Sequence, residues 1–89
     1  MSIVDVFILA TMSPENKLPL SKIVEKIQVA ELSKTPSRLA IYKRLHLLKK
    51  HECVNTFWGE KGEKLYIISP IGLSVIKEFK NQLIRAEST

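Results

Sequence analysis

One β-hairpin followed directly by a helix is the feature of this 89-residue chain that most limits its possible folds. Residues 53–58 and 65–69 are rich in β-branched and aromatic side chains, which favour strands. The intervening residues 59–64 contain two glycines, which can supply the positive φ of a hairpin loop. Ser69-Pro70 then pairs a helix-capping side chain with a proline suited to the first helical turn. The second strand is therefore expected to lead straight into a helix.

Helical periodicity accounts for most of the chain before the hairpin. Residues 3–12 form an apolar stretch interrupted by Asp5, and we interpret it as a buried helix that ends before Ser13. Residues 15–19 follow as a polar connection. Residues 21–28 then place three apolar side chains on one face of a short second helix. With a third helix before the hairpin, the expected order is helix, helix, helix, hairpin, helix.

The third helix is expected to begin at Thr35-Pro36, with the threonine as its cap. At about 100° per residue, one narrow stripe of this helix is apolar and should pack inward. The stripe consists of Ile41, Leu45 and Leu48. The opposite and flanking positions are Arg38, Leu39, Tyr42, Lys43, His46 and Lys50. Leu39 and Leu47 fit this amphipathic pattern poorly, and the periodicity assigns neither a partner.

The same segment carries the whole positive excess of the chain. Six of the 14 Lys and Arg residues and none of the 9 acids lie between Glu31 and Glu52, which leaves 8 cations against 9 acids elsewhere. These six cations are Lys34, Arg38, Lys43, Arg44, Lys49 and Lys50. A phosphate backbone binds such a surface by releasing counterions, so a local excess favours a nucleic-acid partner. The alternative is an ordinary solvated helix face.

Composition bears on domain number and location. A chain of this length with 45% apolar and 26% charged residues is expected to form one domain over residues 1–89. Its single cysteine, Cys53, cannot form an internal disulfide, which fits a reducing compartment. The apolar N-terminal stretch is too short to span a bilayer, and no Lys or Arg precedes it. We therefore expect a cytoplasmic protein without membrane contacts.

Catalytic and metal-binding patterns find little support in the sequence. No carboxylate pair, nucleophile–base arrangement or glycine-rich phosphate loop is visible, so neither an enzyme nor a cofactor is expected. His46, His51 and Cys53 have side chains that ligate metals. Five residues along a helix rotate the two histidines about 140° apart, however, so the three should not converge on one ion.

Two segments have patterns that extend beyond single helices or strands. The first is Ala40-Ile41-Tyr42-Lys43-Arg44-Leu45, then Leu48, then Cys53-Val54. The second is Leu65-Tyr66-Ile67-Ile68-Ser69-Pro70-Ile71-Gly72. The first resembles a recognition helix that runs into a wing strand, and the second resembles the next wing strand followed by a Ser/Thr-x-x-Gly helix start. In their order and spacing they are similar to winged helix-turn-helix DNA-binding regulators.

The resemblance is greatest to small PadR- and MarR-type proteins and to their archaeal plasmid and virus relatives. It implies an α+β fold, mainly helical with a small hairpin wing, whose winged-helix core spans about residues 3–70. A C-terminal dimerisation helix would follow over about residues 70–86. The chain departs from the family at Glu52, where relatives usually have glycine, so either Glu52 is strained or the helix ends differently. The segment from Gln28 to Thr35 is also longer than the tight turn of the simplest members.

The resemblance also implies which residues face double-stranded DNA, because the third helix of this family enters the major groove. Carried onto matching positions, these residues are Lys34, Thr35, Ser37, Arg38, Leu39, Tyr42, Lys43 and His46, with Lys61 and Lys64 on the wing. Arg38 is expected to read guanine, since its planar guanidinium can donate two hydrogen bonds. Ser37 and Tyr42 are expected to donate to phosphates. Packing of a half-buried Tyr42 is the alternative for that residue.

The wing is the weaker half of this predicted interface. Glu60 and Glu63 oppose the positive charge of the two wing lysines. Trp58 is expected to pack at the base of the wing rather than to stack on a nucleobase.

The last helix has more apolar positions than an 89-residue monomer would easily cover. The expected homodimer interface comprises Ile3, Phe7, Leu73, Ile76, Phe79 and Leu83. Packing within the monomer is the alternative. A two-fold dimer would place paired recognition helices roughly 34 Å apart, in successive major grooves.

The sequence thus predicts a homodimeric, sequence-specific regulator of transcription that binds double-stranded DNA and acts as a repressor. Alternatives are a DNA-organising or plasmid-partition protein on the same fold, or a winged-helix adaptor that binds another protein. No residue pattern indicates whether a small-molecule effector binds.

Overall fold

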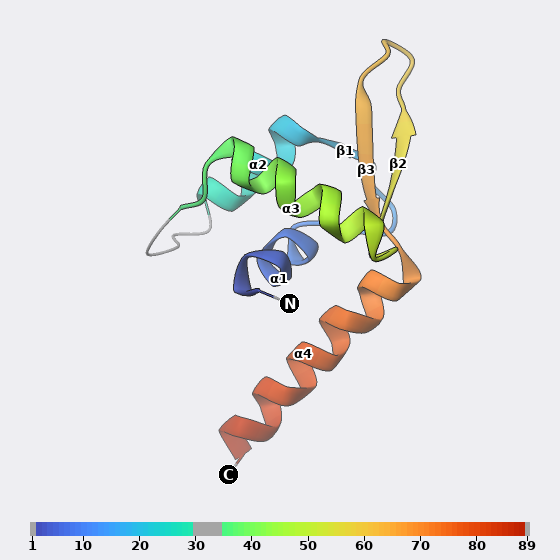
Figure 1. The fold of residues 1–89 in the computed structure, drawn as a ribbon. Coiled ribbons are helices and arrows are strands. Elements are labelled where there is room, and N and C mark those ends of the chain that lie inside the picture. The colour runs from blue at the N-terminus through green and yellow to red at the C-terminus, as the bar shows by residue number, and fades with distance from the viewer. Residues whose placement is uncertain (1, 30–34, 89) are drawn as a thin grey trace.

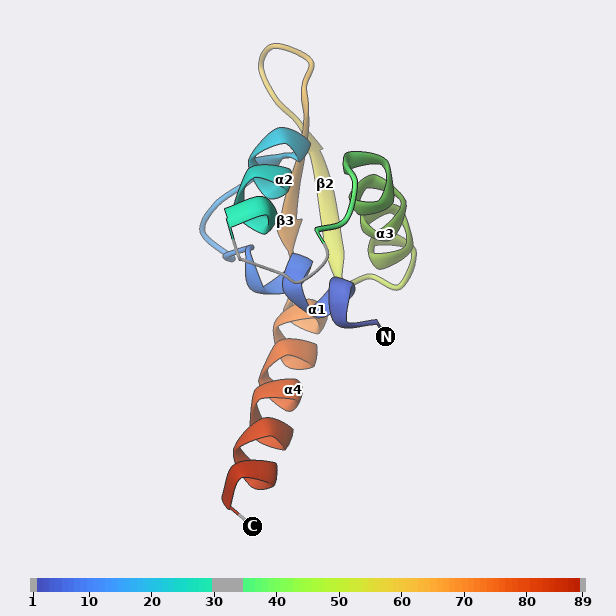
Figure 2. The same ribbon diagram turned by 90° about the vertical axis from the view of Figure 1, so that its left-hand side faces the viewer.

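The computed structural model describes residues 2–29 and 35–88 of the chain, with side chains as far as Gln82. Its helices are α1 (Ile3–Ala10), α2 (Leu20–Val29), α3 (Arg38–Lys50) and α4 (Pro70–Ser88). Its strands are β1 (Leu18–Pro19), β2 (Val54–Trp58) and β3 (Lys64–Ile68). The predicted α+β order is confirmed, with one added strand. In Figures 1 and 2 the β2–β3 hairpin and α4 extend from opposite ends of a body formed by α1, α2 and α3.

The added strand lies in the segment expected to be an irregular polar connection, so that prediction was wrong for Leu18 and Pro19. The three strands form an antiparallel sheet of order β1-β3-β2. Leu18 pairs with Tyr66, far along the chain. A strand of two residues has no periodicity of its own, because its conformation comes from this distant partner.

The core contains the apolar faces predicted from helical spacing. Fully buried side chains come from α1, α2, α3 and β2, and they are Ile8, Leu9, Ile23, Ile27, Ile41, Leu45 and Val54. Leu48 is also buried, which completes the predicted inward stripe of α3. Figure 2 shows α2 and α3 lying against the sheet on either side of its mid-line, with α1 below them. The opposite side of α3 is consequently left uncovered.

Serine, not threonine, caps α3. The helix begins at Arg38, and the Ser37 side chain accepts a hydrogen bond from the backbone N–H of Ala40 at 3.1 Å. The predicted start at Thr35-Pro36 was therefore wrong, because the capping residue must directly precede the first helical residue. The same reasoning was correct at α4. There Ser69 accepts from the N–H of Gly72 at 3.0 Å, and Pro70 is the first helical residue.

Glu52 occupies the left-handed turn that ends α3, with φ 64°. The N–H of Cys53 donates to the carbonyl of Leu48 at 2.9 Å, and that of Glu52 donates to the carbonyl of Lys49 at 3.0 Å. These two bonds form a Schellman motif, in which the left-handed position is usually glycine. The departure from the family pattern is therefore explained by strain at Glu52 and not by a different helix end. The Ser69 hydroxyl holds the turn by donating to the Glu52 carbonyl at 2.6 Å.

Replacing the strained residue by glycine should stabilise the protein. Glu52→Gly relieves a left-handed conformation that costs a residue with a side chain about 1–2 kcal/mol. Part of this gain is offset because glycine makes the unfolded chain more flexible. We expect a net gain of about 0.5–1 kcal/mol in the free energy of unfolding, measured by urea denaturation.

Glu60→Gly is the matched control, because it also removes an exposed glutamate from a turn but at a residue without positive φ. It should leave stability unchanged or slightly lower. A lower urea midpoint for Glu52→Gly than for the wild type would contradict the prediction.

Candidate nucleic-acid interface

The uncovered face of α3 contains the side chains that the sequence analysis placed toward DNA. Arg38, Lys43 and His46 are exposed, and Tyr42 is 43% exposed. The exposed fraction of Tyr42 favours an accessible role over half-buried packing. Lys49 and Lys50 extend the cationic surface to the end of the helix. No acidic residue lies within α3.

Two of the predicted residues lie at the start of α3, and one lies outside the described part of the chain. Thr35 and Ser37 are both exposed. The Ser37 hydroxyl accepts the capping hydrogen bond, and because a hydroxyl also has one donor, it remains able to donate to a phosphate. Lys34 lies outside the described residues.

Arg44, one of the six cations of the acid-free segment, does not contribute a free charge. Its Nε donates to Asp5 Oδ1 at 2.7 Å, and its Nη2 donates to Asp5 Oδ2 at 2.5 Å. The Asp5 side chain is 4% exposed and that of Arg44 is 36% exposed. This bidentate pair joins the middle of α3 to the first turn of α1. No local sequence pattern predicts this pair, because 39 residues separate the two partners.

The Asp5 carboxylate stays ionised although it is buried. Burial by itself raises the pKa of Asp5, but hydrogen bonds from Arg44 and Ser2 outweigh it, and the pKa lies below its ordinary value. The pKa of Arg44 is raised chiefly by its hydrogen bonds to Asp5. Asp5 also accepts from the Ser2 N–H at 3.1 Å in a capping box. The pair therefore remains charged on both sides at neutral pH.

Three lysines lie on or beside the wing, and two of them lie over aromatic rings. Lys61 is exposed, and the Lys64 ammonium lies 5.6 Å from the centre of the Tyr66 ring. Lys17 Nζ lies 4.3 Å from the centre of the Phe57 ring. Lys17 was not among the predicted interface residues. It reaches the wing only because the following residues pair with β3, and no signal in the sequence predicts that pairing.

Trp58 is 77% exposed, so the prediction that it packs at the base of the wing was wrong. It pairs with Lys64 at the last position of the hairpin ladder, next to the loop. The buried end of the same ladder is Val54 paired with Ile68. Phe57, which is 44% exposed, adds a second accessible aromatic ring to the wing.

Within residues 2–29 and 35–88, no group of three or more His, Cys, Asp or Glu side chains is arranged to hold a metal ion. His46 and His51 are exposed, whereas Cys53 is buried. Burial, and secondarily the charge of Asp5, raises the pKa of the Cys53 thiol, which disfavours a reactive thiolate. Among the described helices, none combines the length and the apolar character needed to cross a membrane.

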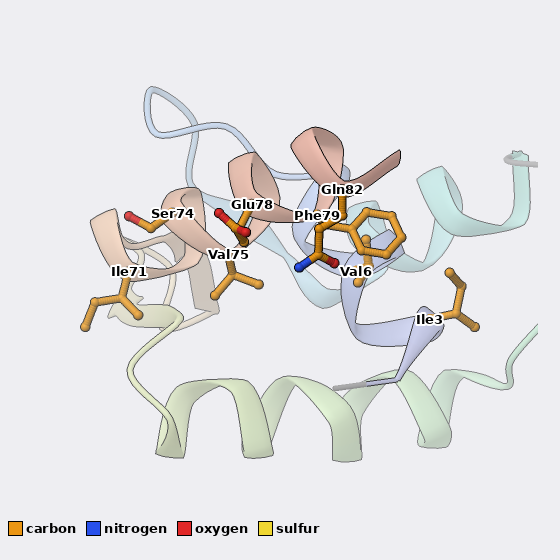
Figure 3. Close-up of a pocket in the computed structure, with 8 residues that line it drawn as sticks. All are labelled: Ile3, Val6, Ile71, Ser74, Val75, Glu78, Phe79 and Gln82. Atoms are coloured by element: carbon orange, nitrogen blue, oxygen red, sulfur yellow. The ribbon is translucent and has the colours of Figure 1, made fainter. Parts of the chain in front are cut away.

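A separate apolar groove lies between α1 and α4. It has a volume of about 800 Å³, and Figure 3 shows side chains from both helices around it. Its lining residues are Ile3, Val6, Ile71, Ser74, Val75, Glu78, Phe79 and Gln82. Ile3 is 58% exposed and Ile71 is 48% exposed. The groove is thus open apolar surface.

Of the predicted interface residues, Ile3 and Phe79 line this groove, whereas Phe7, Leu73 and Ile76 do not. Ile3 is exposed, and Phe7, Leu73 and Phe79 are half-buried. Ile76 is 8% exposed and belongs to the core, so it offers little surface to a second copy. The side chain of Leu83 lies outside the described part of the chain. Val6, Ile71 and Val75 were not predicted.

No family model matches the sequence, and no curated protein sequence is similar to it. Solved structures are similar. A PadR family transcription regulator from Clostridium difficile R20291 matches 98% of this chain and 93% of its own, with a TM-score of 0.83 at 12% identity. The fold is that of PadR and MarR winged-helix regulators.

Other winged-helix structures of both types are similar. A transcriptional regulator from Clostridium thermocellum matches 96% of this chain and 84% of its own, with a TM-score of 0.79 at 20% identity. MepR, a transcription regulator of the Staphylococcus aureus multidrug efflux pump MepA, matches 99% of this chain but 62% of its own, with a TM-score of 0.82 at 11% identity. In the terms of the winged-helix fold, α3 occupies the position of the recognition helix and the β2–β3 hairpin occupies that of the wing.

The ion pair between α1 and α3 should be required for stability. Arg44→Met keeps most of the side-chain volume but leaves the Asp5 carboxylate buried without a cation. We expect a loss of about 2 kcal/mol in the free energy of unfolding at pH 7. This is less than for a fully buried pair, because the Arg44 side chain is 36% exposed. Urea denaturation measures the change.

The same pair should make stability depend on pH. Because the folded-state pKa of Asp5 is depressed, its contribution is complete above the unfolded-state value of about 3.9 and is lost as the pH falls through the folded-state value. Between pH 7 and pH 3 the wild type should therefore lose more stability than Arg44→Met. Lys43→Met removes the neighbouring exposed cation and serves as the control. Equal effects of the two substitutions would contradict this role for the pair.

Proposed function

We propose that the protein is a homodimeric transcription regulator that binds specific sites in double-stranded DNA and acts as a repressor. The observation that carries this proposal is the uncovered, acid-free, cationic face of α3 within a winged-helix fold. The fold supplies the scaffold, and the face supplies the chemistry that a polyanion requires. Both are needed, because winged helices also occur as protein-binding adaptors.

The electrostatics of α3 favour phosphate over a protein partner of mixed charge. Arg38, Lys43, Lys49 and Lys50 are exposed, and Arg44 is satisfied by Asp5. The internal ion pair neutralises a carboxylate that would otherwise weaken the positive potential close to α3. Exposed cations that neutralise phosphates release counterions, and the resulting affinity falls steeply as salt rises.

We assign the contacts with DNA bases and those with DNA phosphates to different residues. Arg38 is the first residue of α3, and first-turn residues of a recognition helix reach base edges in the major groove. Its guanidinium can donate two hydrogen bonds to guanine. Tyr42 and Lys43 lie further along the exposed face and would bind phosphates. Lys61 and Lys64 on the wing, and Lys17 beside it, would add contacts to the DNA phosphates.

The groove between α1 and α4 is the proposed dimer interface. Its open apolar side chains require a cover, and a second copy related by a two-fold axis would bury the same groove on both subunits. The two recognition helices would then meet successive major grooves roughly 34 Å apart. A dimer bound across a promoter represses by excluding the polymerase.

Charge reversal on α3 should weaken DNA binding without affecting the fold. Arg38→Glu and Lys43→Glu should each lower affinity at least about tenfold, and the double variant should abolish binding. The measurement is a gel-shift titration with random 30-base-pair duplexes at low ionic strength, followed by a salt series. Lys77→Glu on α4 is the control, since it changes net charge equally at an exposed residue outside the interface.

Outcomes of this titration separate the proposed function from its alternatives. Unchanged affinity in the double variant would contradict the proposed role of α3 in DNA binding. Absence of wild-type binding even at low salt would instead indicate an adaptor. Footprinting on enriched duplexes distinguishes the two DNA-binding functions: a short protected palindrome supports a regulator, whereas protection that spreads with concentration indicates a DNA-organising protein.

Charges placed in the α1–α4 groove should dissociate the dimer. Ile3→Asp and Ile71→Asp introduce carboxylates at exposed apolar positions, which a paired subunit would have to desolvate. Sedimentation velocity should show a wild-type dimer and predominantly monomeric variants at the same concentration. Val29→Asp changes a 74% exposed apolar residue of α2 outside the groove and should remain dimeric. A wild type that is monomeric at all concentrations would contradict this interface.

A further inference from the structure

The residues that the structure describes leave Leu39 largely exposed. It is the second residue of α3 and is 61% exposed, whereas Ile41 and Leu45 of the same helix are completely buried. An exposed leucine gains none of the free energy that burial in the core provides. Its surroundings on α3 are cationic rather than apolar. The side chain is therefore available to a partner.

The helical geometry places Leu39 in the middle of the uncovered face. At about 100° per residue, Lys43 lies about 40° to one side of Leu39 and His46 about 20° to the other. The buried stripe of Ile41, Leu45 and Leu48 lies on the far side of the helix. Leu39 is thus central in the proposed DNA-binding face. It also lies in the first turn, where recognition helices approach base edges.

The chemistry of the side chain limits what it can recognise. Leucine has no hydrogen-bond donor or acceptor, so it cannot read the polar pattern of a base pair. The C5-methyl group of thymine is the apolar group displayed in the major groove, and apolar side chains contact it. We infer that Leu39 recognises thymine by packing against this methyl group. The inference rests on the proposed function and adds the identity of a base to it.

Tyr42 supports an apolar contact at this place. It lies three residues after Leu39, and residues three apart are neighbours on a helix surface. Its ring is 43% exposed, so together the two side chains form a small apolar patch within the cationic face. Arg38 and Lys43 flank this patch, and no acid lies in α3. A second copy of the chain would bring like charges together there, whereas DNA supplies both the phosphates and the methyl groups.

The test replaces thymine by uracil, which pairs identically but lacks the C5-methyl group. Duplexes enriched by the wild type from a random pool are synthesised with all thymines, with all uracils, and with uracil at single positions. Wild-type affinity should fall about fourfold for each contacted methyl group removed, the factor that corresponds to burial of one methyl. The single replacements should locate the effect at one thymine in each half-site.

Leu39→Ala should bind the thymine duplex more weakly and should bind the thymine and uracil duplexes equally. The substitution preserves helix propensity at an exposed residue, so folding should be retained, as circular dichroism will check. Leu47→Ala is the matched control, because Leu47 is an apolar residue of the same helix, 38% exposed, but lies near its other end. That control should discriminate thymine from uracil as the wild type does. Any general effect of uracil on duplex shape would persist in both variants.

Failure of this inference is distinguishable from failure of the proposed function. Tight wild-type binding with equal affinity for thymine and uracil duplexes would overturn the role of Leu39 and leave DNA binding intact. Undiminished discrimination by Leu39→Ala would overturn it as well. If no duplex is enriched and none binds at low salt, the result contradicts both the inference and the proposed function.

Discussion

The bidentate ion pair between Asp5 and Arg44 is the interaction on which the remaining architecture depends. It joins α1 to the middle of α3 and so helps to set the rotation of α3 about its own axis. In this orientation the stripe containing Ile41 packs inward while Lys43, next to Arg44, faces outward. The carboxylate is buried at a desolvation cost, which two charge-assisted hydrogen bonds and the Ser2 capping box offset. The pair also removes one cation from the surface charge.

A second junction connects the end of α3 to the start of α4. The Ser69 hydroxyl donates to the carbonyl of Glu52 and accepts from the N–H of Gly72, while the Ser69 N–H donates to the carbonyl of Cys53 at 3.0 Å. A Cβ at Gly72 would collide with that Cys53 carbonyl and would lie 2.7 Å from Ile68 Cγ1, so only glycine permits this approach. Helix α3 is thus held at its middle by α1 and at its end by Ser69, which caps α4. The groove proposed for the dimer is lined by α1 and α4. In the proposed dimer, the contact at this groove would therefore set the spacing between the two α3 helices.

The proposed interface combines cations that bind phosphates with side chains whose shape fits base edges. Lys43, Lys49 and Lys50 are exposed point charges suited to phosphates, which position a protein without selecting sequence. Selection requires side chains that fit one base edge, and the first turn of α3 offers two of opposite chemistry. Arg38 presents a fork of donors, and Leu39 presents only a hydrocarbon surface. Together, the polar Arg38 and the apolar Leu39 would discriminate between base pairs better than either side chain alone.

Local patterns in the sequence determined the helices, the hairpin, the inward stripe of α3 and the Ser69-Pro70 helix start, because each depends on neighbours within a few residues. The resemblance carried by residues 40–54 and 65–72 extended these patterns to a winged helix. The tertiary structure decided what depends on distant partners: strand β1, the pairing of Arg44 with Asp5, the approach of Lys17 to the wing and the exposure of Trp58. It also decided that Ser37 rather than Thr35 caps α3, and that Glu52 accepts a left-handed conformation. Hydrophobic periodicity specifies which face of an element is buried, but contacts between elements specify which charges remain free, and those charges make the surface that a partner meets.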